Sequence, residues 1–207
     1  TFNVGLDFGI FGGRINGNVD AYYRKTSDLL NNITTPMGNN FSNTVISNVG
    51  NMKNMGVEFN LNFIPIEKQD MRWTINVNGT YQKTEITKLT NDDSTYLGVQ
   101  TGANMGGTGG YTSLHRVGYA PYTYYLYQQA YDENGKAIQN VLVDRDGDGS
   151  ITEADRYVTG KSITPKFFFG LSSQFTYKKW DFGFNAHGSF GGYALNRVAV
   201  SYTHLRA

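Results

Sequence analysis

The sequence has no cysteine, only four prolines and almost no net charge. Without cysteine, a disulfide framework and thiol chemistry are excluded in these 207 residues. A formal net charge of +1 gives no electrostatic reason to expect a nucleic-acid partner. The three histidines, His115, His187 and His204, are too scattered along the chain to suggest a metal cluster.

Long apolar runs are missing as well. No stretch approaches the roughly 20 apolar residues that a membrane-spanning helix needs. The first residues do not form the basic, apolar and small-residue segments of a signal peptide. Thr1 lies at the start of a predicted strand instead, so we expect a fragment of a longer chain.

Alternation of apolar and other residues is the main feature that the sequence does have. In the first segment Phe2, Val4 and Leu6 fall on one face, and polar residues or glycine fall on the other. A period of two over this length predicts a β-strand. The segments with this pattern are 2–10, 15–23, 57–63, 73–81, 167–177 and 180–188.

The predicted connections differ strongly in length. Pro65 is expected to end the third strand. Extended structure is also expected in Tyr119–Tyr131, giving about seven strands. The connections are tight at Gly12-Gly13 and Lys178-Lys179, short at 64–71, long and polar at 25–55, and very long and irregular at 83–165.

Two fold classes fit this pattern, a soluble β-sandwich and a membrane β-barrel. Strands of about ten residues span a bilayer when tilted, and alternating short and long connections are typical of outer-membrane barrels. Aromatic residues also lie at both ends of the apolar faces, as in interfacial girdles. The sequence therefore favours all-β, antiparallel, up-and-down transmembrane β-barrel strands that form a partial barrel. The aromatic residues are Phe63, Trp73, Tyr177 and Trp180 near the short turns, and Phe2, Tyr23, Tyr81 and Phe167 near the long loops.

A short acidic segment, residues 144–155, has the spacing of an EF-hand calcium loop. Aspartates occupy positions 1, 3 and 5, and Gly149 at position 6 permits the sharp turn that such a loop needs. The carbonyl of residue 7, a water held by residue 9 and a carboxylate at position 12 would complete the shell. The predicted calcium ligands are Asp144, Asp146, Asp148, Ser150, Thr152 and Asp155.

One departure from the EF-hand pattern weakens the calcium interpretation, and an alternative is open. Position 12 holds Asp155 instead of the glutamate of an EF-hand, so a shorter side chain closes the shell and weaker binding is expected. The alternative is an acidic turn stabilised by local Asx hydrogen bonds.

Counting turns gives the predicted topology. If the tight turns are periplasmic, as in outer-membrane barrels, then 25–55 and 83–165 are both external. Any barrel strands inside 83–165 must then be even in number. The calcium loop would lie outside the cell.

Other chemistry receives little support. A glycosidase needs two carboxylates that flank a cleft, and most clustered carboxylates here belong to the calcium loop, so no enzyme is predicted. A group of tyrosines in 119–131 could stack on sugar rings, but packing against neighbouring residues is the preferred interpretation. The group is Tyr119, Tyr122, Tyr124, Tyr125 and Tyr127.

Four stretches resemble a known family. Asn48 to Glu58, read as N-x-G-x-x-x-N-x-G-x-E, resembles the entry to a strand in TonB-dependent receptors. The calcium segment followed by Gly160, Pro165 and Gly170 is similar to the late part of SusC/RagA-type TonB-linked transporters. Trp180-Asp181-Phe182 and Gly188 to Gly192 look like the next strand and its loop. The resemblance extends to Asn196.

The resemblance implies a large plugged barrel in the outer membrane of a Gram-negative bacterium, surrounded by outer-membrane lipid. It also implies a surface lipoprotein partner of the SusD type, energy supplied by the TonB complex, and import of oligosaccharides or peptides. The expected organisation is a barrel segment, 1–196, with a tail of doubtful origin at 197–207. The alternative function is a soluble or surface-attached, calcium-stabilised β-domain that binds carbohydrate.

Overall fold

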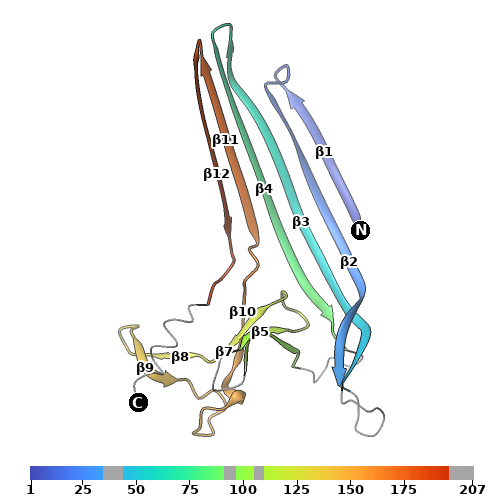
Figure 1. Ribbon diagram of the computed structural model, residues 1–207, viewed down its shortest axis with the longest axis vertical. Coiled ribbons are helices and arrows are strands. Elements are labelled where there is room, and N and C mark those ends of the chain that lie inside the picture. The colour runs from blue at the N-terminus through green and yellow to red at the C-terminus, as the bar shows by residue number, and fades with distance from the viewer. Residues whose placement is uncertain (35–43, 91–96, 105–109, 196–207) are drawn as a thin grey trace.

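The computed structural model describes residues 1–34, 44–90, 97–104 and 110–195. The predicted tail at 197–207 lies outside the described residues. Six long strands form one antiparallel sheet in the order β1-β2-β3-β4-β11-β12 (Figure 1). The strands are β1 (Phe2–Ile10), β2 (Ile15–Thr34), β3 (Thr44–Lys68), β4 (Met71–Lys88), β11 (Phe167–Tyr177) and β12 (Trp180–Phe190).

A smaller module is inserted between β4 and β11 and lies at the lower end of the long sheet in Figure 1. We call its described residues, 97–104 and 110–162, the inserted module. It contains a four-stranded sheet of order β10-β7-β6-β5, a β8-β9 hairpin and one short 3₁₀ helix, η1. The elements are β5 (Val99–Asn104), β6 (Tyr111–His115), β7 (Thr123–Leu126), β8 (Gln129–Tyr131), β9 (Ala137–Leu142), η1 (Glu153–Asp155) and β10 (Tyr157–Ser162).

The strand register places the predicted apolar faces on the same side of the sheet. Residues directly opposite each other in antiparallel strands point to the same face. One row across four strands is Leu61, Val77, Leu171 and Ala186. The row beside it, on the other face, is Asn60, Asn78, Gly170 and His187. The inside–outside alternation expected from the sequence is therefore continuous over the sheet.

Aromatic rings cover glycines on the apolar face. Phe59 lies opposite Gly79, and Phe169 lies opposite Gly188. A Cβ at Gly79 would lie 2.5 Å from Phe59 Cε1, and a Cβ at Gly188 would lie 2.5 Å from Phe169 Cε1. Each ring therefore occupies the space above its glycine, and a larger residue there would push the ring out of the face.

The apolar face of the long sheet is bare. Phe2 is 66% exposed, and Phe184 and Phe190 are 56% and 61% exposed. Among the described residues, the buried apolar side chains are instead Ile86, Leu89, Leu114 and Tyr125, at the end of β4 and in the inserted module. The long sheet thus has no core of its own, unlike the β-sandwich considered from the sequence.

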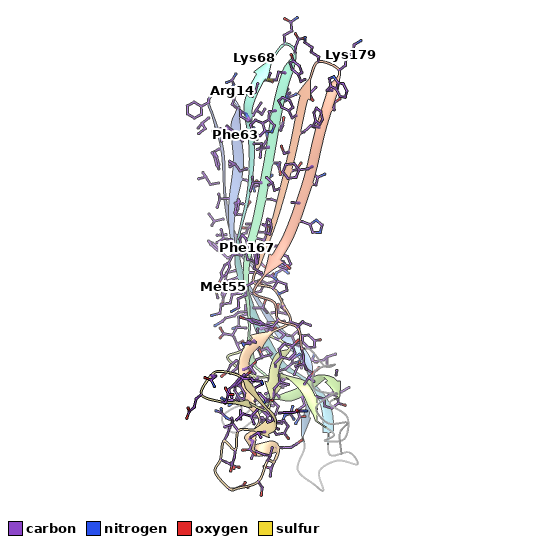
Figure 2. All side chains as sticks on the ribbon, turned by 90° about the vertical axis from the view of Figure 1, so that its left-hand side faces the viewer. Arg14, Met55, Phe63, Lys68, Phe167 and Lys179 are labelled. Atoms are coloured by element: carbon purple, nitrogen blue, oxygen red, sulfur yellow. The ribbon has the colours of Figure 1, made fainter. Side chains whose placement is uncertain are left out.

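The bare face has charged ends. Figure 2 shows Arg14, Lys68 and Lys179 at one end of the sheet, and Phe167 and Met55 well below them. Beyond Met55, on the same face, Lys53 forms an ion pair of 2.8 Å with Glu85. Between these ends, the 11 residues of β11 extend about 34 Å, or about 26 Å when tilted by 40°, which matches the apolar band of about 25 Å of an outer-membrane barrel.

The tight turns are confirmed. The β1–β2 turn has positive φ at Gly12 (65°) and Gly13 (88°), and Lys178 in the β11–β12 turn has φ 53°. We call this end of the sheet, with the third turn at residues 69–70, the turn end. Because β11 is antiparallel to β4 and adjacent to it, both ends of the predicted 83–165 connection lie at the opposite end, as the turn count requires.

The prediction of a long loop at 25–55 is wrong over the described residues of that range. β2 continues to Thr34 and β3 begins at Thr44, and the two pair antiparallel with register shifts between Thr26 and Leu30. The polar sequence concealed these strands because, beyond the apolar band, neither face needs apolar side chains and backbone pairing alone continues the ladder.

Two further predictions are also wrong. Pro65 does not end β3, which continues to Lys68 through a register shift between Phe63 and Ile66, since a bulge accommodates a residue without an N–H. Over its described residues the stretch 83–165 is not irregular, because β4 reaches Lys88 and β5 to β10 follow. β7 and β8 confirm the extended structure predicted in Tyr119–Tyr131, but they pair outside the long sheet, which has six strands instead of about seven.

The described residues contain no helix that is long and apolar enough to cross a membrane.

We predict that Leu61→Arg destabilises the barrel of the parent protein by about 2–4 kcal/mol, because Leu61 lies mid-band on the apolar face. Asn76→Arg, on the opposite face of the neighbouring strand, should cost less and serves as the control. The measurement is urea-induced unfolding of both variants in lipid vesicles. Equal costs at the two positions would show that the faces are wrongly assigned.

Candidate calcium loop

The connection between β9 and η1 brings three carboxylates together. One oxygen from each of Asp144, Asp146 and Asp148 lies within 4.8 Å of the others. No other group of three or more histidine, aspartate or glutamate side chains is this close in the part of the chain that the structure describes. The structure thus assembles positions 1, 3 and 5 of the predicted loop.

Local hydrogen bonds shape this turn. The Asp144 carboxylate accepts the backbone N–H of Gly147 at 2.6 Å and that of Gly149 at 2.8 Å. Both glycines have positive φ, 77° and 85°, a conformation that a β-carbon disfavours. The side chains of Asp146 and Asp148 each accept the backbone N–H two residues later. These Asx bonds were the alternative explanation of the motif, and they coexist with the clustered carboxylates.

The electrostatics of the cluster favour a cation. The backbone N–H of Asp148 lowers the pKa of Asp146, but desolvation and the negative charges of Asp148 and Asp155 outweigh it. The pKa of Asp146 is therefore raised above its ordinary value. Repulsion among the carboxylates is therefore not fully relieved by the loop's own N–H groups, and a hard cation with oxygen ligands would relieve it.

Asp155 differs from the other three aspartates. Its side chain is fully buried and accepts the backbone N–H of Arg145 at 2.6 Å and of Thr152 at 2.7 Å. The Thr152 N–H, then the Arg145 N–H, lower the pKa of the Asp155 carboxyl despite its desolvation. Asp155 therefore ties the two ends of the loop together, and the structure does not bring it into the group formed by Asp144, Asp146 and Asp148.

The remaining two predicted ligands have more limited roles here. The Thr152 hydroxyl accepts the backbone N–H of Ala154 at 3.2 Å and forms a capping box with Asp155 at the start of η1. Ser150 donates its backbone N–H to Asp148 at 2.7 Å. The donor set present, carboxylates with neighbouring hydroxyl and carbonyl oxygens, fits calcium better than a transition metal.

The buried side chain of Arg156 connects this loop to the module sheet. Arg156 donates to the carbonyls of Tyr111 and Tyr125, the latter at 2.8 Å, and its guanidinium lies 4.1 Å from the Tyr125 ring. Gly110 is required beside it, since a Cβ there would lie 2.7 Å from Arg156 Nη1. The end of the calcium loop is thus fixed in the module core.

The tyrosines of 119–131 support the packing interpretation where their contacts are defined. Tyr125 is buried under Arg156, and the Tyr124 hydroxyl donates to the carbonyl of Tyr193 at 3.0 Å. Tyr119 accepts the N–H of Ile86 on β4 through its backbone carbonyl at 2.9 Å. These bonds attach the inserted module to the long sheet.

The histidines do not gather in the described residues. His115 packs edge-on against Tyr122, and burial lowers the pKa of His115. His187 lies on the polar face of the long sheet, opposite Gly170. His204 lies outside the described residues.

Sequence reasoning missed two roles in this region. A local sequence pattern could have predicted the anchoring by Asp155, because Thr152-x-x-Asp155 has capping-box spacing. No local pattern could have predicted the role of Arg156, because its partner Tyr111 is 45 residues away.

Comparison with known proteins identifies the family. The family model for the TonB-dependent receptor-like β-barrel matches residues 1–205. The chain belongs to the TonB-dependent receptor β-barrel family. It is 43% identical over 211 residues to TonB-dependent receptor SusC of Bacteroides thetaiotaomicron, covering 99% of this chain. It is 29% identical to TonB-dependent receptor P39 of Formosa agariphila, again over 99% of this chain.

Solved structures of the same family have the same fold. A chain of the RagAB peptide transporter matches 91% of this TonB-dependent receptor segment with a TM-score of 0.66 and 26% identity. The segment covers 20% of that chain and 21% of the SusC sequence. It thus spans about a fifth of these relatives, and its six strands are part of a TonB-dependent barrel.

We predict that Asp155→Asn loosens the calcium loop, because the amide cannot accept both N–H groups that the carboxylate now satisfies. Hydrogen exchange at Arg145 and Thr152 should accelerate in the parent protein, while Glu133→Gln, an exposed control on the β8–β9 turn, should leave it unchanged.

The same amides report the pH dependence. Because the Asp155 pKa is lowered in the folded state, the stabilisation of the loop by this carboxylate is fully present above the ordinary pKa of 3.8. The stabilisation is lost as the pH falls through the lower pKa of the folded state. Unchanged exchange in Asp155→Asn would show that the carboxylate does not anchor the loop.

Proposed function

We propose that this segment is part of an outer-membrane transporter that imports nutrients with energy from the TonB complex. One observation carries the proposal: the long sheet presents a continuous apolar face without any core, bounded at both ends by charged residues. A soluble carbohydrate-binding domain would have to bury this face, because exposed apolar patches of this size are rarely left in water. Membership of the TonB-dependent receptor family supports the same function.

The proposed substrate is an oligosaccharide, with a peptide as the second candidate. The resemblance to SusC/RagA-type transporters favours both classes, and the solved structure that this segment resembles is named a peptide transporter. The proposed partner is a SusD-type surface lipoprotein at the module end of the sheet. The polar face, with Asn60, Asn76 and Asn78, would line a wet lumen.

Uptake by cells with and without the parent gene tests the proposal. Cells with the gene should take up labelled oligosaccharides, and a protonophore that abolishes the energy for TonB should stop uptake. Labelled oligopeptides of similar mass are the comparison. Uptake of peptides alone would overturn the oligosaccharide assignment, and uptake unaffected by the protonophore would overturn TonB-driven transport.

We also propose that the calcium loop is external and holds one structural calcium ion. Asp144, Asp146 and Asp148 would supply carboxylate oxygens, Ser150 its carbonyl, Thr152 a bound water and Asp155 the closing carboxylate. The short turns would then be periplasmic. External calcium modules bind with dissociation constants of about 10⁻⁴–10⁻³ M, the weak range that an aspartate at position 12 suits.

Chelation should therefore loosen residues 140–160 without unfolding the long strands. We expect added protease to cut near Asp148 in intact cells only after chelation, and to cut Asp146→Ala/Asp148→Ala with or without calcium. Glu133→Ala, an exposed carboxylate on the neighbouring hairpin, is the control. Cleavage only after the outer membrane is breached would show that the loop is periplasmic.

A further inference from the structure

A groove interrupts the apolar face near the turn end of the sheet. Its volume is about 450 Å³, within the range of small-ligand sites. Its walls come from four adjacent strands, β3, β4, β11 and β12. The principal lining residues are Ile66, Trp73, Ser173, Phe175, Phe182 and Phe184.

A small residue in a row of large ones creates this groove. Ser173 lies between Ile75 and Phe184, whereas its neighbour two residues along the strand is Phe175. Trp73 Nε1 donates to Ser173 Oγ at 2.9 Å. This bond satisfies the indole N–H in an otherwise apolar site and holds the indole at the side of the groove.

Three lysine side chains lie at the turn end of the groove. Lys178 and Lys179 form the turn that follows Tyr177, and Lys178 Nζ lies 5.5 Å from the Tyr177 ring. Lys68 is opposite Met71, in the same row as Tyr177, and Figure 2 shows Lys68 and Lys179 at this end.

The nearby carboxylates of the strands point to the other face. Glu67 lies 3.9 Å from Arg72, and Asp181 accepts a hydrogen bond of 2.7 Å from Thr176. Arg72, Thr176 and Asp181 form one row on the polar face. The 69–70 turn adds one carboxylate, that of Asp70, whose backbone carbonyl accepts the N–H of Lys178 at 2.8 Å. Against Lys68, Lys178 and Lys179, the turn end still carries an excess of positive charge beside an apolar groove.

We propose that the groove binds one glycerophospholipid, with an acyl chain against Ser173 and the phosphate beside Lys178 and Lys179. This inference rests on the proposed membrane function. Phe175 is three residues from Lys178, about 10 Å along the strand, so the lysines lie at headgroup level when the groove lies among the acyl chains. Free phosphate would find only the Ser173 hydroxyl in the groove, and a soluble sugar would leave most of its hydroxyls unpaired there.

The test uses the complete parent protein in nonionic detergent. Native mass spectrometry measures binding during titration with phosphatidylglycerol, and parallel titrations use diacylglycerol and inorganic phosphate. Ser173→Phe fills the groove, and Leu6→Phe places the same phenyl side chain on the apolar face of β1, away from the groove, as its control. Lys178→Asn/Lys179→Gln removes the cations, with Arg14→Gln in the β1–β2 turn as its control. Asparagine tolerates the positive φ of residue 178.

Ser173→Phe should abolish the first phosphatidylglycerol adduct. The double lysine variant should weaken it by about tenfold or more, since each lysine near a lipid headgroup contributes about 1 kcal/mol. Both controls should bind as the unchanged protein does. Diacylglycerol should bind no better to the unchanged protein than to the lysine variant.

Phosphatidylglycerol binding unchanged in both test variants would overturn the proposal. Equal binding of inorganic phosphate would assign the site to a free anion. A change of oligomeric state in Ser173→Phe without loss of lipid binding would assign it to a second copy of the chain. Refolding of each variant into vesicles separates the two levels of inference. Failure of the parent protein to insert would overturn the proposed membrane function. Insertion with no effect of the variants on lipid binding would overturn only the proposed lipid site.

Discussion

The register of the long antiparallel sheet is the constraint on which the rest of the structure depends. A strand has a side-chain period of two, so a slip of one residue would exchange the apolar and polar faces of that strand. The pairing of Leu61 with Val77, and of Val77 with Leu171, keeps three strands in phase. The register shifts lie outside the middle of the apolar band. One is the bulge between Phe63 and Ile66, close to the turn, and the others lie between Thr26 and Leu30 and between Asn51 and Met52, toward the module.

Stability is distributed unequally between the two parts of the chain. The inserted module has buried residues, including Leu114 and Tyr125, and a fully buried Asp155 beside the buried Arg156. The long sheet has backbone pairing and ring-over-glycine contacts but no apolar core. In lipid, which supplies the missing apolar surroundings, such a sheet satisfies its backbone groups only within a closed barrel. The six strands therefore depend on the rest of a parent barrel, whereas the module carries its own packing.

The candidate calcium loop lies in the inserted module, away from the long sheet, and reaches that sheet through the module core (Figure 1). Its carboxylate cluster is at the surface, but its last residue, Asp155, is buried and is followed directly by Arg156 in the module core. Hydrogen bonds from Gly118 to Ile86 and from Ile86 to Tyr119 then join the module to β4. An ion in the loop would be connected to the long sheet through this sequence of packed and hydrogen-bonded residues.

The sequence by itself determined the six strands within the apolar band, the two tight turns and the acidic motif, because each is encoded by residues close together in the chain. The family resemblance rested on the same local patterns. Only the tertiary structure decided how far β2 and β3 continue beyond the band, where side-chain polarity no longer indicates pairing. It also decided that Pro65 lies in a bulge, that 83–165 folds into a module, and that Arg156 anchors that module. These features depend on partners far away in the sequence, and no local periodicity predicts them.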